Sequence, residues 1–216
     1  MAQNLKCWKK KASGSSSAKR TDIWAGHLVI APVIEVHAEP NAVSEVVTRL
    51  VSGTGVAVNE TRDGWKKVHA NRVGWVESHH LRGLDNIPQN VDEKRVMLES
   101  DSHGMIGVPY LWGGSSGNGI DCSGFAQLLH RWVGIEIPRD ADMQCDAAKP
   151  VEPPFEIGDL IFFSEDDDKR ITHVGMSLGG WKVIHSSRSH NGVYVDDLQV
   201  RKSLMDIFVG AGSYLR

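Results

Sequence analysis

Three side chains in the second half of the chain have the chemistry of a nucleophile and its proton acceptors. Cys122 carries a thiol, and His173 and His185 carry imidazoles. A thiol, a general base and a polar group that orients the base are the parts needed for covalent catalysis at a carbonyl carbon. The sequence therefore indicates acyl transfer through a cysteine, provided that the fold brings these three side chains together.

The residues around Cys122 favour a reactive thiol. A glycine-rich stretch precedes Asp121, and an apolar-periodic segment from Phe125 to Val133 predicts an amphipathic helix. Asp121 is a suitable N-cap, which puts Cys122 in the first turn. Unpaired N–H groups and the helix dipole favour the thiolate there. The alternative interpretation is a buried structural cysteine where a strand meets a helix.

The histidines lie in two short, β-prone runs, 171–176 and 183–187, on either side of a turn at 178–181. Such runs predict a hairpin, whose pairing would bring the two imidazoles side by side. His173 begins a strand after a loop, so we expect it to be the base and His185 to orient it. Cysteine with two histidines is also a zinc ligand set, but no other metal-site spacing accompanies it. We expect no metal and no cofactor.

At this point the sequence resembles the NlpC/P60 cysteine peptidases, which have a permuted papain-like core. The resemblance is specific because six blocks occur in the family's order over the C-terminal half of the chain. These blocks are 109–114, 121–125, 137–140 with Gln144, 158–163, 172–176 and 183–186. Ala141 departs from the family, because many relatives have a serine there.

The resemblance implies an α+β fold with helices packed on an antiparallel sheet, and catalysis by Cys122, His173 and His185. It implies hydrolysis of murein peptides, at the bond between γ-D-glutamate and a diamino acid, in substrates with a free N-terminal L-alanine. It also implies that Tyr110 helps to hold the oxyanion, and that Asp121 and Ser123 receive the substrate's amino group. Helix capping by Asp121 is an equally good interpretation and is compatible with that role.

Two other functions fit the same residues. One is an amidase or acyltransferase that acts on another substrate. The second is a wall-binding protein that carries an inactive peptidase domain, although the intact set of Cys122, His173 and His185 argues against it.

Composition describes a soluble globular protein of 216 residues, of which 41% are hydrophobic and 24% charged. A formal net charge of −3 gives no support for a nucleic-acid partner. Residues 1–22 predict a flexible basic tail, without an apolar run that would make a secretory signal or a membrane span. We therefore expect a cytoplasmic protein, or a secreted or periplasmic one if the start is truncated. Three cysteines predict no disulfide framework.

Residues 23–84 predict a small β-barrel followed by a linker at 85–90. Five short strands are expected, at 26–34, 46–51, 55–59, 65–70 and 73–77. Asp63 to Val68 and Val73 to Val76 resemble the bacterial SH3 module that often accompanies these peptidases. This module either binds a wall polymer or closes one end of the cleft, and we favour the second role. Trp24, Trp65 and Trp75 are expected in its core rather than as exposed stacking platforms.

Residues 91–216 are expected to form the peptidase domain. A helix begins near Val91 with Asn90 as its N-cap, and His103 is expected at the surface. A second short helix is predicted at 141–147. Trp112 is expected in the core, and Arg139 is expected to hold a loop together rather than to touch substrate.

Overall fold

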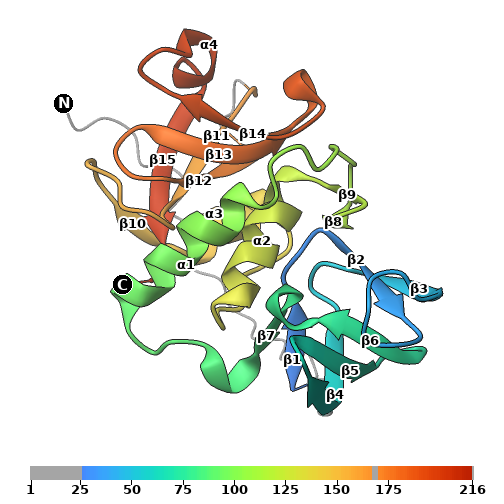
Figure 1. Ribbon diagram of the computed structural model, residues 1–216. Helices are drawn as coiled ribbons and strands as arrows, with labels where there is room; N and C mark the ends of the chain where they lie inside the picture. The colour runs from blue at the N-terminus through green and yellow to red at the C-terminus, as the bar shows by residue number, and fades with distance from the viewer. Residues whose placement is uncertain (1–25, 167–169, 216) are drawn as a thin grey trace.

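The computed structural model describes residues 26–166 and 170–215. Figure 1 shows two packed parts, an N-terminal all-β part and a larger C-terminal part in which helices cover a sheet. The predicted basic tail and Trp24 lie outside the described residues.

The N-terminal part is a seven-stranded antiparallel sheet with the strand order β3-β2-β6-β5-β4-β1-β7. Its strands are β1 (His27–Val29), β2 (Val33–His37), β3 (Val46–Val51), β4 (Gly55–Arg62), β5 (Trp65–His69), β6 (Val73–Glu77) and β7 (Leu81–Gly83). Val29, Val36, Val56 and Val68 are among the buried side chains at its centre. Trp75 is buried as expected, whereas Trp65 is only partly buried.

Two of the strand predictions for this part were wrong. The single strand expected at 26–34 is two strands, because the chain bends at residues 31–32, where Pro32 has no N–H to donate and its carbonyl accepts from Ser52. The prediction also missed β7, which pairs with β1 in the register Val29 to Leu81. Strand β7 has only three residues, so its alternation of polar and apolar side chains is too short to predict a strand.

The C-terminal part is built on a six-stranded antiparallel sheet with the order β10-β15-β11-β12-β13-β14. Its strands are β10 (Lys149–Val151), β11 (Leu160–Phe163), β12 (His173–Ser177), β13 (Lys182–Ser187), β14 (Gly192–Asp197) and β15 (Phe208–Ser213). The predicted hairpin is β12 with β13. The short strand β10 pairs with β15.

Three helices cover one face of this sheet, α1 (Val91–His103), α2 (Cys122–Trp132) and α3 (Ala141–Ala147). A short helix α4 (Lys202–Met205) precedes β15, and a small hairpin, β8 (Ser115–Ser116) with β9 (Gly119–Ile120), precedes α2. Asn90 and Asp121 cap α1 and α2 through their side chains, as predicted. The central helix, α2, buries Phe125, Leu129 and Trp132 completely.

The two parts share an interface that is both apolar and ionic. Leu28 of β1 belongs to the same buried cluster as the residues of α2. Arg82 of β7 donates to both carboxylate oxygens of Asp101 on α1, at 2.5 and 3.0 Å, with both side chains about 10% exposed. Gly117, in the turn between β8 and β9, lies against the backbone of Pro32. The SH3-like part is therefore packed directly against the segment that leads into Cys122.

Within the described residues, we find no helix that combines the length and apolar character needed to span a bilayer.

Candidate active site

Cys122 is the first residue of α2, the helix that packs on the inner strands β12 and β13. The Asp121 carboxylate accepts from the Gly124 N–H at 2.7 Å, which starts the helix at Cys122. The backbone N–H of Val174, the residue that follows His173, lies close enough to the Cys122 thiol to lower its pKa. Strand β12 therefore places the residue next to His173 beside the sulfur. The predicted placement of Cys122 in the first helical turn is confirmed.

The electrostatic environment of the thiol differs from the expectation. Backbone N–H groups of Val174, Ser123 and Cys122 lower its pKa, as a helix start should. Burial raises it, however, and burial is the larger effect, so the pKa of Cys122 lies above its ordinary value. Helix position alone does not ionise this thiol, and a base is needed to take its proton.

His173 and His185 lie side by side, as the hairpin predicted. Nε2 of His173 is 2.6 Å from Nδ1 of His185. His173 and Gly175 lie on the same face of β12, and a Cβ on Gly175 would come 3.0 Å from Cβ of His185 and 2.4 Å from Val183. The absence of a side chain at Gly175 gives His185 the space in which it reaches His173.

His173 is held in the neutral form that a base requires. Burial, and to a smaller extent the charge of His185, lower its pKa to about 3. Near neutral pH the favoured state is therefore an uncharged imidazole near an uncharged thiol. Nδ1 of His173 is the ring nitrogen that does not face His185.

A third side chain, which the sequence pattern did not indicate, extends this pair. Nε2 of His185 lies 3.3 Å from Oδ2 of Asp196 on β14. The register pairs His185 directly with Tyr194, and Asp196 is two residues further along the same face. In the sequence, the alternation of Tyr194 and Asp196 indicates that the two polar side chains share one face of a strand. Only the pairing of β13 with β14 identifies His185 as their neighbour.

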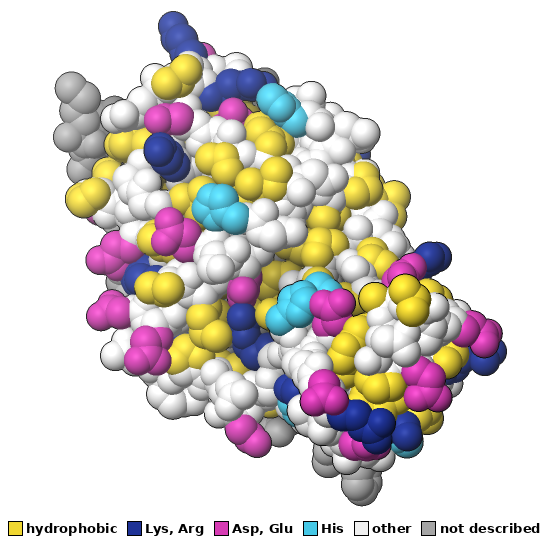
Figure 2. Space-filling model, in the orientation of Figure 1, with side chains coloured by type: hydrophobic (Ala, Val, Ile, Leu, Met, Phe, Trp, Pro, Cys, Tyr) yellow, Lys and Arg dark blue, Asp and Glu magenta, His cyan; other side chains and the backbone are white. Residues whose placement is uncertain are grey.

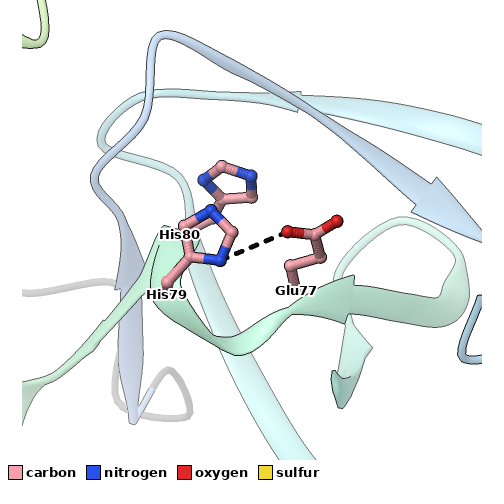
Figure 3. Close-up of side chains that lie close together, drawn as sticks. All are labelled: Glu77, His79 and His80. Atoms are coloured by element: carbon pink, nitrogen blue, oxygen red, sulfur yellow. Dashed lines mark ion pairs between the residues drawn. The ribbon is translucent and has the colours of Figure 1, made fainter. Parts of the chain in front are cut away.

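The zinc interpretation of Cys122, His173 and His185 finds no geometric support. Nδ1 of His185 faces Nε2 of His173 at 2.6 Å and Nε2 of His185 faces Asp196 at 3.3 Å, so neither nitrogen of His185 is directed at a site shared with Cys122. Within residues 26–166 and 170–215, one group of three ligand-type side chains has its atoms within 4.8 Å of one another, Glu77, His79 and His80 of the SH3-like part. Figure 3 shows His79 paired with Glu77, at 3.2 Å, and the tilted His80 ring 3.8 Å from that of His79.

Tyr110 precedes the glycine-rich loop, and its backbone bridges Ile120, two residues before Cys122. Burial is the largest influence on its hydroxyl and raises its pKa, and the nearby Cys122 adds to this effect. The hydroxyl also interacts with Arg188, whose guanidinium lies 5.7 Å from the Tyr110 ring and 5.1 Å from the Trp112 ring. The prediction that Trp112 is a core residue was wrong, because its side chain is 73% exposed. Its position in a surface loop next to two glycines, Gly113 and Gly114, leaves it no layer to pack under.

Asp121 is buried and already has several partners. Nη1 and Nη2 of Arg139 donate to its two oxygens at 3.0 and 2.6 Å, and the backbone N–H of Gly113 donates at 2.9 Å. Nη1 of Arg139 also donates to Oγ of Ser123 at 2.8 Å. The expectation that Arg139 holds a loop together is confirmed, since its guanidinium joins the glycine-rich loop to the start of α2. Recognition of an amino group by Asp121 and Ser123 stays a prediction.

Two further contacts fix the segment around the thiol. Gln144 of α3 donates to the carbonyls of Ser123 and Pro138, at 3.0 and 2.8 Å. The buried Ser186 hydroxyl of β13 donates to the carbonyl of Ile120 at 2.7 Å. The segment that leads into α2 and the histidine-bearing hairpin are thus joined by a direct hydrogen bond.

The surface around the site carries mixed charge. In the view of Figure 2, Lys and Arg side chains are interspersed with Asp and Glu over both parts. A cavity of about 270 Å³ opens between the SH3-like part and α2, lined by residues 51–54 and by Gln127 and Arg131 among others. Neither Cys122 nor the histidines line this cavity, so it is separate from the candidate active site.

A cysteine at a helix start, next to a histidine pair on an antiparallel sheet, has the architecture of the papain-like class of cysteine enzymes. Residues 107–209 match the NlpC/P60 family, and residues 32–82 match the bacterial SH3 domain. The chain therefore carries a bacterial SH3 domain followed by a domain that belongs to the NlpC/P60 family, as the resemblance predicted.

Individual relatives agree with this assignment. The chain is 44% identical over 92 residues to a γ-D-glutamyl-L-lysine dipeptidyl-peptidase of Bacillus subtilis, covering 42% of this chain and 31% of that protein. It is 38% identical over 112 residues to the protein of the same name in Bacillus cereus, covering 51% of this chain and 33% of that protein. The chain thus spans about a third of the length of these two relatives. The crystal structure of an NlpC/P60 family protein from Bacillus cereus superposes with a TM-score of 0.74 at 28% identity, covering 88% of this chain and 63% of that one.

Proposed function

We propose that this protein is a cysteine peptidase that hydrolyses peptidoglycan stem peptides, at the bond between γ-D-glutamate and a diamino acid. The observation that carries the proposal is the position of Cys122 at the start of α2, where its thiol lies near Val174 and so next to the paired imidazoles of His173 and His185. The names of the two Bacillus relatives support the choice of bond.

In the proposed mechanism His173 is a general base rather than the partner of a pre-formed thiolate. The raised pKa of Cys122 and the lowered pKa of His173 favour the neutral pair before substrate binds. As Sγ attacks the carbonyl carbon, its proton passes to Nδ1 of His173. A backbone N–H at the start of α2 and the Tyr110 hydroxyl stabilise the oxyanion. The His173 imidazolium then protonates the leaving amine, and water hydrolyses the thioester.

The proposed substrate has a free amino group on its L-alanine. Asp121 and Ser123 are the polar side chains that flank the thiol, and the carboxylate of Asp121 would attract an ammonium group. Arg139 already neutralises much of that carboxylate, at 2.6 Å. Recognition of the substrate's amino group is therefore expected to rely on hydrogen bonds from that group to Asp121 and Ser123 as much as on the charge of Asp121.

For the SH3 domain we propose a role in closing one end of the cleft. Its contact with the loop before Cys122, through Pro32 and Gly117, supports this role over that of an independent wall-binding module. A closed end would restrict the enzyme to short, free peptides.

Mass spectrometry of the products from L-Ala-γ-D-Glu-diamino acid peptides tests the proposal. We expect cleavage after D-glutamate in peptides with a free amino end, a sharp reduction after N-acetylation, and no product with Cys122→Ala. The Cys122→Ala variant should keep its thermal midpoint nearly unchanged, since it loses only one sulfur atom. Cleavage at another bond, or equal turnover of capped and free peptides, would contradict the substrate assignment, and activity that survives Cys122→Ala would contradict the mechanism.

A further inference from the structure

In the histidine pair, one nitrogen of each ring faces the other ring, and the hydrogen between these two nitrogens can belong to either ring. The 2.6 Å contact between Nε2 of His173 and Nδ1 of His185 accommodates one hydrogen when both rings are neutral. If His173 carries it, Nδ1 of His173 has a free lone pair and can accept the thiol proton. If His185 carries it, Nδ1 of His173 is itself protonated and cannot act as a base.

Asp196 distinguishes between these arrangements because a carboxylate only accepts hydrogen bonds. Its Oδ2 lies 3.3 Å from Nε2 of His185, and its side chain is 11% exposed. The hydrogen bond from His185 is the largest cause of a lowered pKa of Asp196, so the carboxyl is ionised near neutral pH. An ionised oxygen at this position favours a hydrogen on Nε2 of His185 and therefore a bare Nδ1 on the same ring.

We propose that Asp196 is a positioning residue that sets the proton arrangement of the whole chain Asp196, His185, His173. With Nε2 of His185 protonated, Nδ1 of His185 accepts from Nε2 of His173. Nδ1 of His173 is then left as the base for Cys122. The proposal rests on the function proposed above, to which it adds a residue outside the cysteine and the two histidines.

Neighbouring groups hold Asp196 in the orientation that this role needs. Nη1 of Arg201 lies 4.0 Å from Oδ1, the oxygen that does not face His185. Tyr194 also interacts with the Asp196 carboxyl, and its ring lies 4.7 Å from that of His185. Oδ1 therefore faces the Arg201 guanidinium, while Oδ2 faces the imidazole of His185.

This asymmetry makes Asp196→Asn more damaging than Asp196→Ala. The Asn carbonyl oxygen should take the Oδ1 position near Arg201, which leaves the NH₂ group facing Nε2 of His185. An N–H donor at that position favours the opposite arrangement, in which Nδ1 of His173 is protonated and faces away from His185. Alanine removes the preference without reversing it. A purely structural role predicts the reverse order, because Asn preserves the shape of Asp.

Three measurements on the full chain test the proposal. Long-range ¹H–¹⁵N spectra of the histidine rings should show Nε2–H on both His173 and His185 in the wild type, and Nδ1–H in Asp196→Asn. Alkylation of Cys122 by iodoacetamide and the kcat/KM of peptide cleavage should both fall about 10²-fold in Asp196→Asn and about 10-fold in Asp196→Ala. These values are set below the ~10⁴-fold loss seen when the altered aspartate contacts the catalytic histidine directly.

The matched control is Asp206→Asn, which removes the same charge from an exposed side chain and should change none of these readouts. Equal or smaller losses in Asp196→Asn than in Asp196→Ala would overturn the proposal, as would Nδ1–H on His185 in the wild type. The spectra and the alkylation rates need no peptide substrate. If they follow the expected order while no murein peptide is cleaved, the role of Asp196 stands and the proposed substrate is wrong.

Discussion

Arg139→Gln should destabilise the protein far more than an ordinary ion-pair mutation. The guanidinium makes four hydrogen bonds, two to Asp121, one to Ser123 and one to the Gly114 carbonyl. Removing it leaves the Asp121 carboxylate, whose side chain is 9% exposed, with the amide donors of Gly113 and Gly124 and a long contact, 3.4 Å, from the Ser123 hydroxyl. A buried charge that loses its partner is strongly unfavourable because it has already given up its hydration.

The expected magnitude lies between two limits. Breaking a fully buried pair costs about 3–5 kcal/mol, and breaking an exposed pair costs about 0–1 kcal/mol. The Arg139 side chain is 34% exposed, and two amide donors remain on Asp121, so the loss is discounted from the upper limit. We expect the free energy of unfolding to fall by about 2–3 kcal/mol.

Urea denaturation at neutral pH, followed by circular dichroism, measures this loss, and the chain offers a matched control. Arg49 also binds a carboxylate at 2.8 Å, that of Glu35, but its side chain is 66% exposed. Arg49→Gln should therefore cost less than about 1 kcal/mol. Adding Asp121→Asn to Arg139→Gln removes the uncompensated charge, so the double variant should lose about 1–2 kcal/mol less than the sum of the two single variants. Equal losses for Arg139→Gln and Arg49→Gln, or strict additivity in the double variant, would refute the reasoning.

Three other changes test how the fold supports the site. Gly117→Ala would put a Cβ 2.0 Å from the Pro32 carbonyl oxygen, so it should displace the SH3 domain from the loop before Cys122. Turnover of longer peptides should then increase relative to that of short ones. An unchanged size preference would contradict the cleft-closing role. Gly175→Ala should push His185 away from His173 and lower kcat more than it raises KM, whereas full activity would show that the pair tolerates displacement. His130 is fully buried, and burial lowers its pKa from 6.5 to about 4. As pH falls from 6.5 towards 4, the unfolded chain protonates His130 while the folded chain does not, so the free energy of unfolding decreases over this range. His130→Gln, compared with wild type by urea denaturation at pH 7 and pH 4.5, should lose about 2.4 kcal/mol less on acidification, and identical losses would rule out this source.

The helices and most of the strands were predictable because their signals are local. Asp121 before an apolar-periodic segment determined both the start of α2 and the place of Cys122, and Asn90 did the same for α1. The two histidine runs on either side of a turn predicted β12 and β13 with their imidazoles adjacent. In each case the information lies within about ten residues, so no tertiary contact was needed to find it.

Features that depend on strand register or on burial were not predictable. Asp196 becomes a partner of His185 only through the pairing of β14 with β13. The exposure of Trp112 depends on which elements cover the glycine-rich loop, and the sequence pattern contains no such information. The strands β7 and β10 are too short to show an alternation of their own and exist because β1 and β15 provide edges to pair with.

The sequence by itself indicated which groups are the candidates for the chemistry, since a thiol and two imidazoles are the side chains that the proposed acyl transfer needs. Only the tertiary structure decided their protonation. Burial from every surrounding element raises the pKa of Cys122 and lowers that of His173, and it outweighs the local effect of the helix start. Desolvation depends on all the atoms packed around a group, whereas the effect of a helix start on a pKa depends on a few neighbours in the chain. Only the effect of the helix start could therefore be inferred from the order of residues.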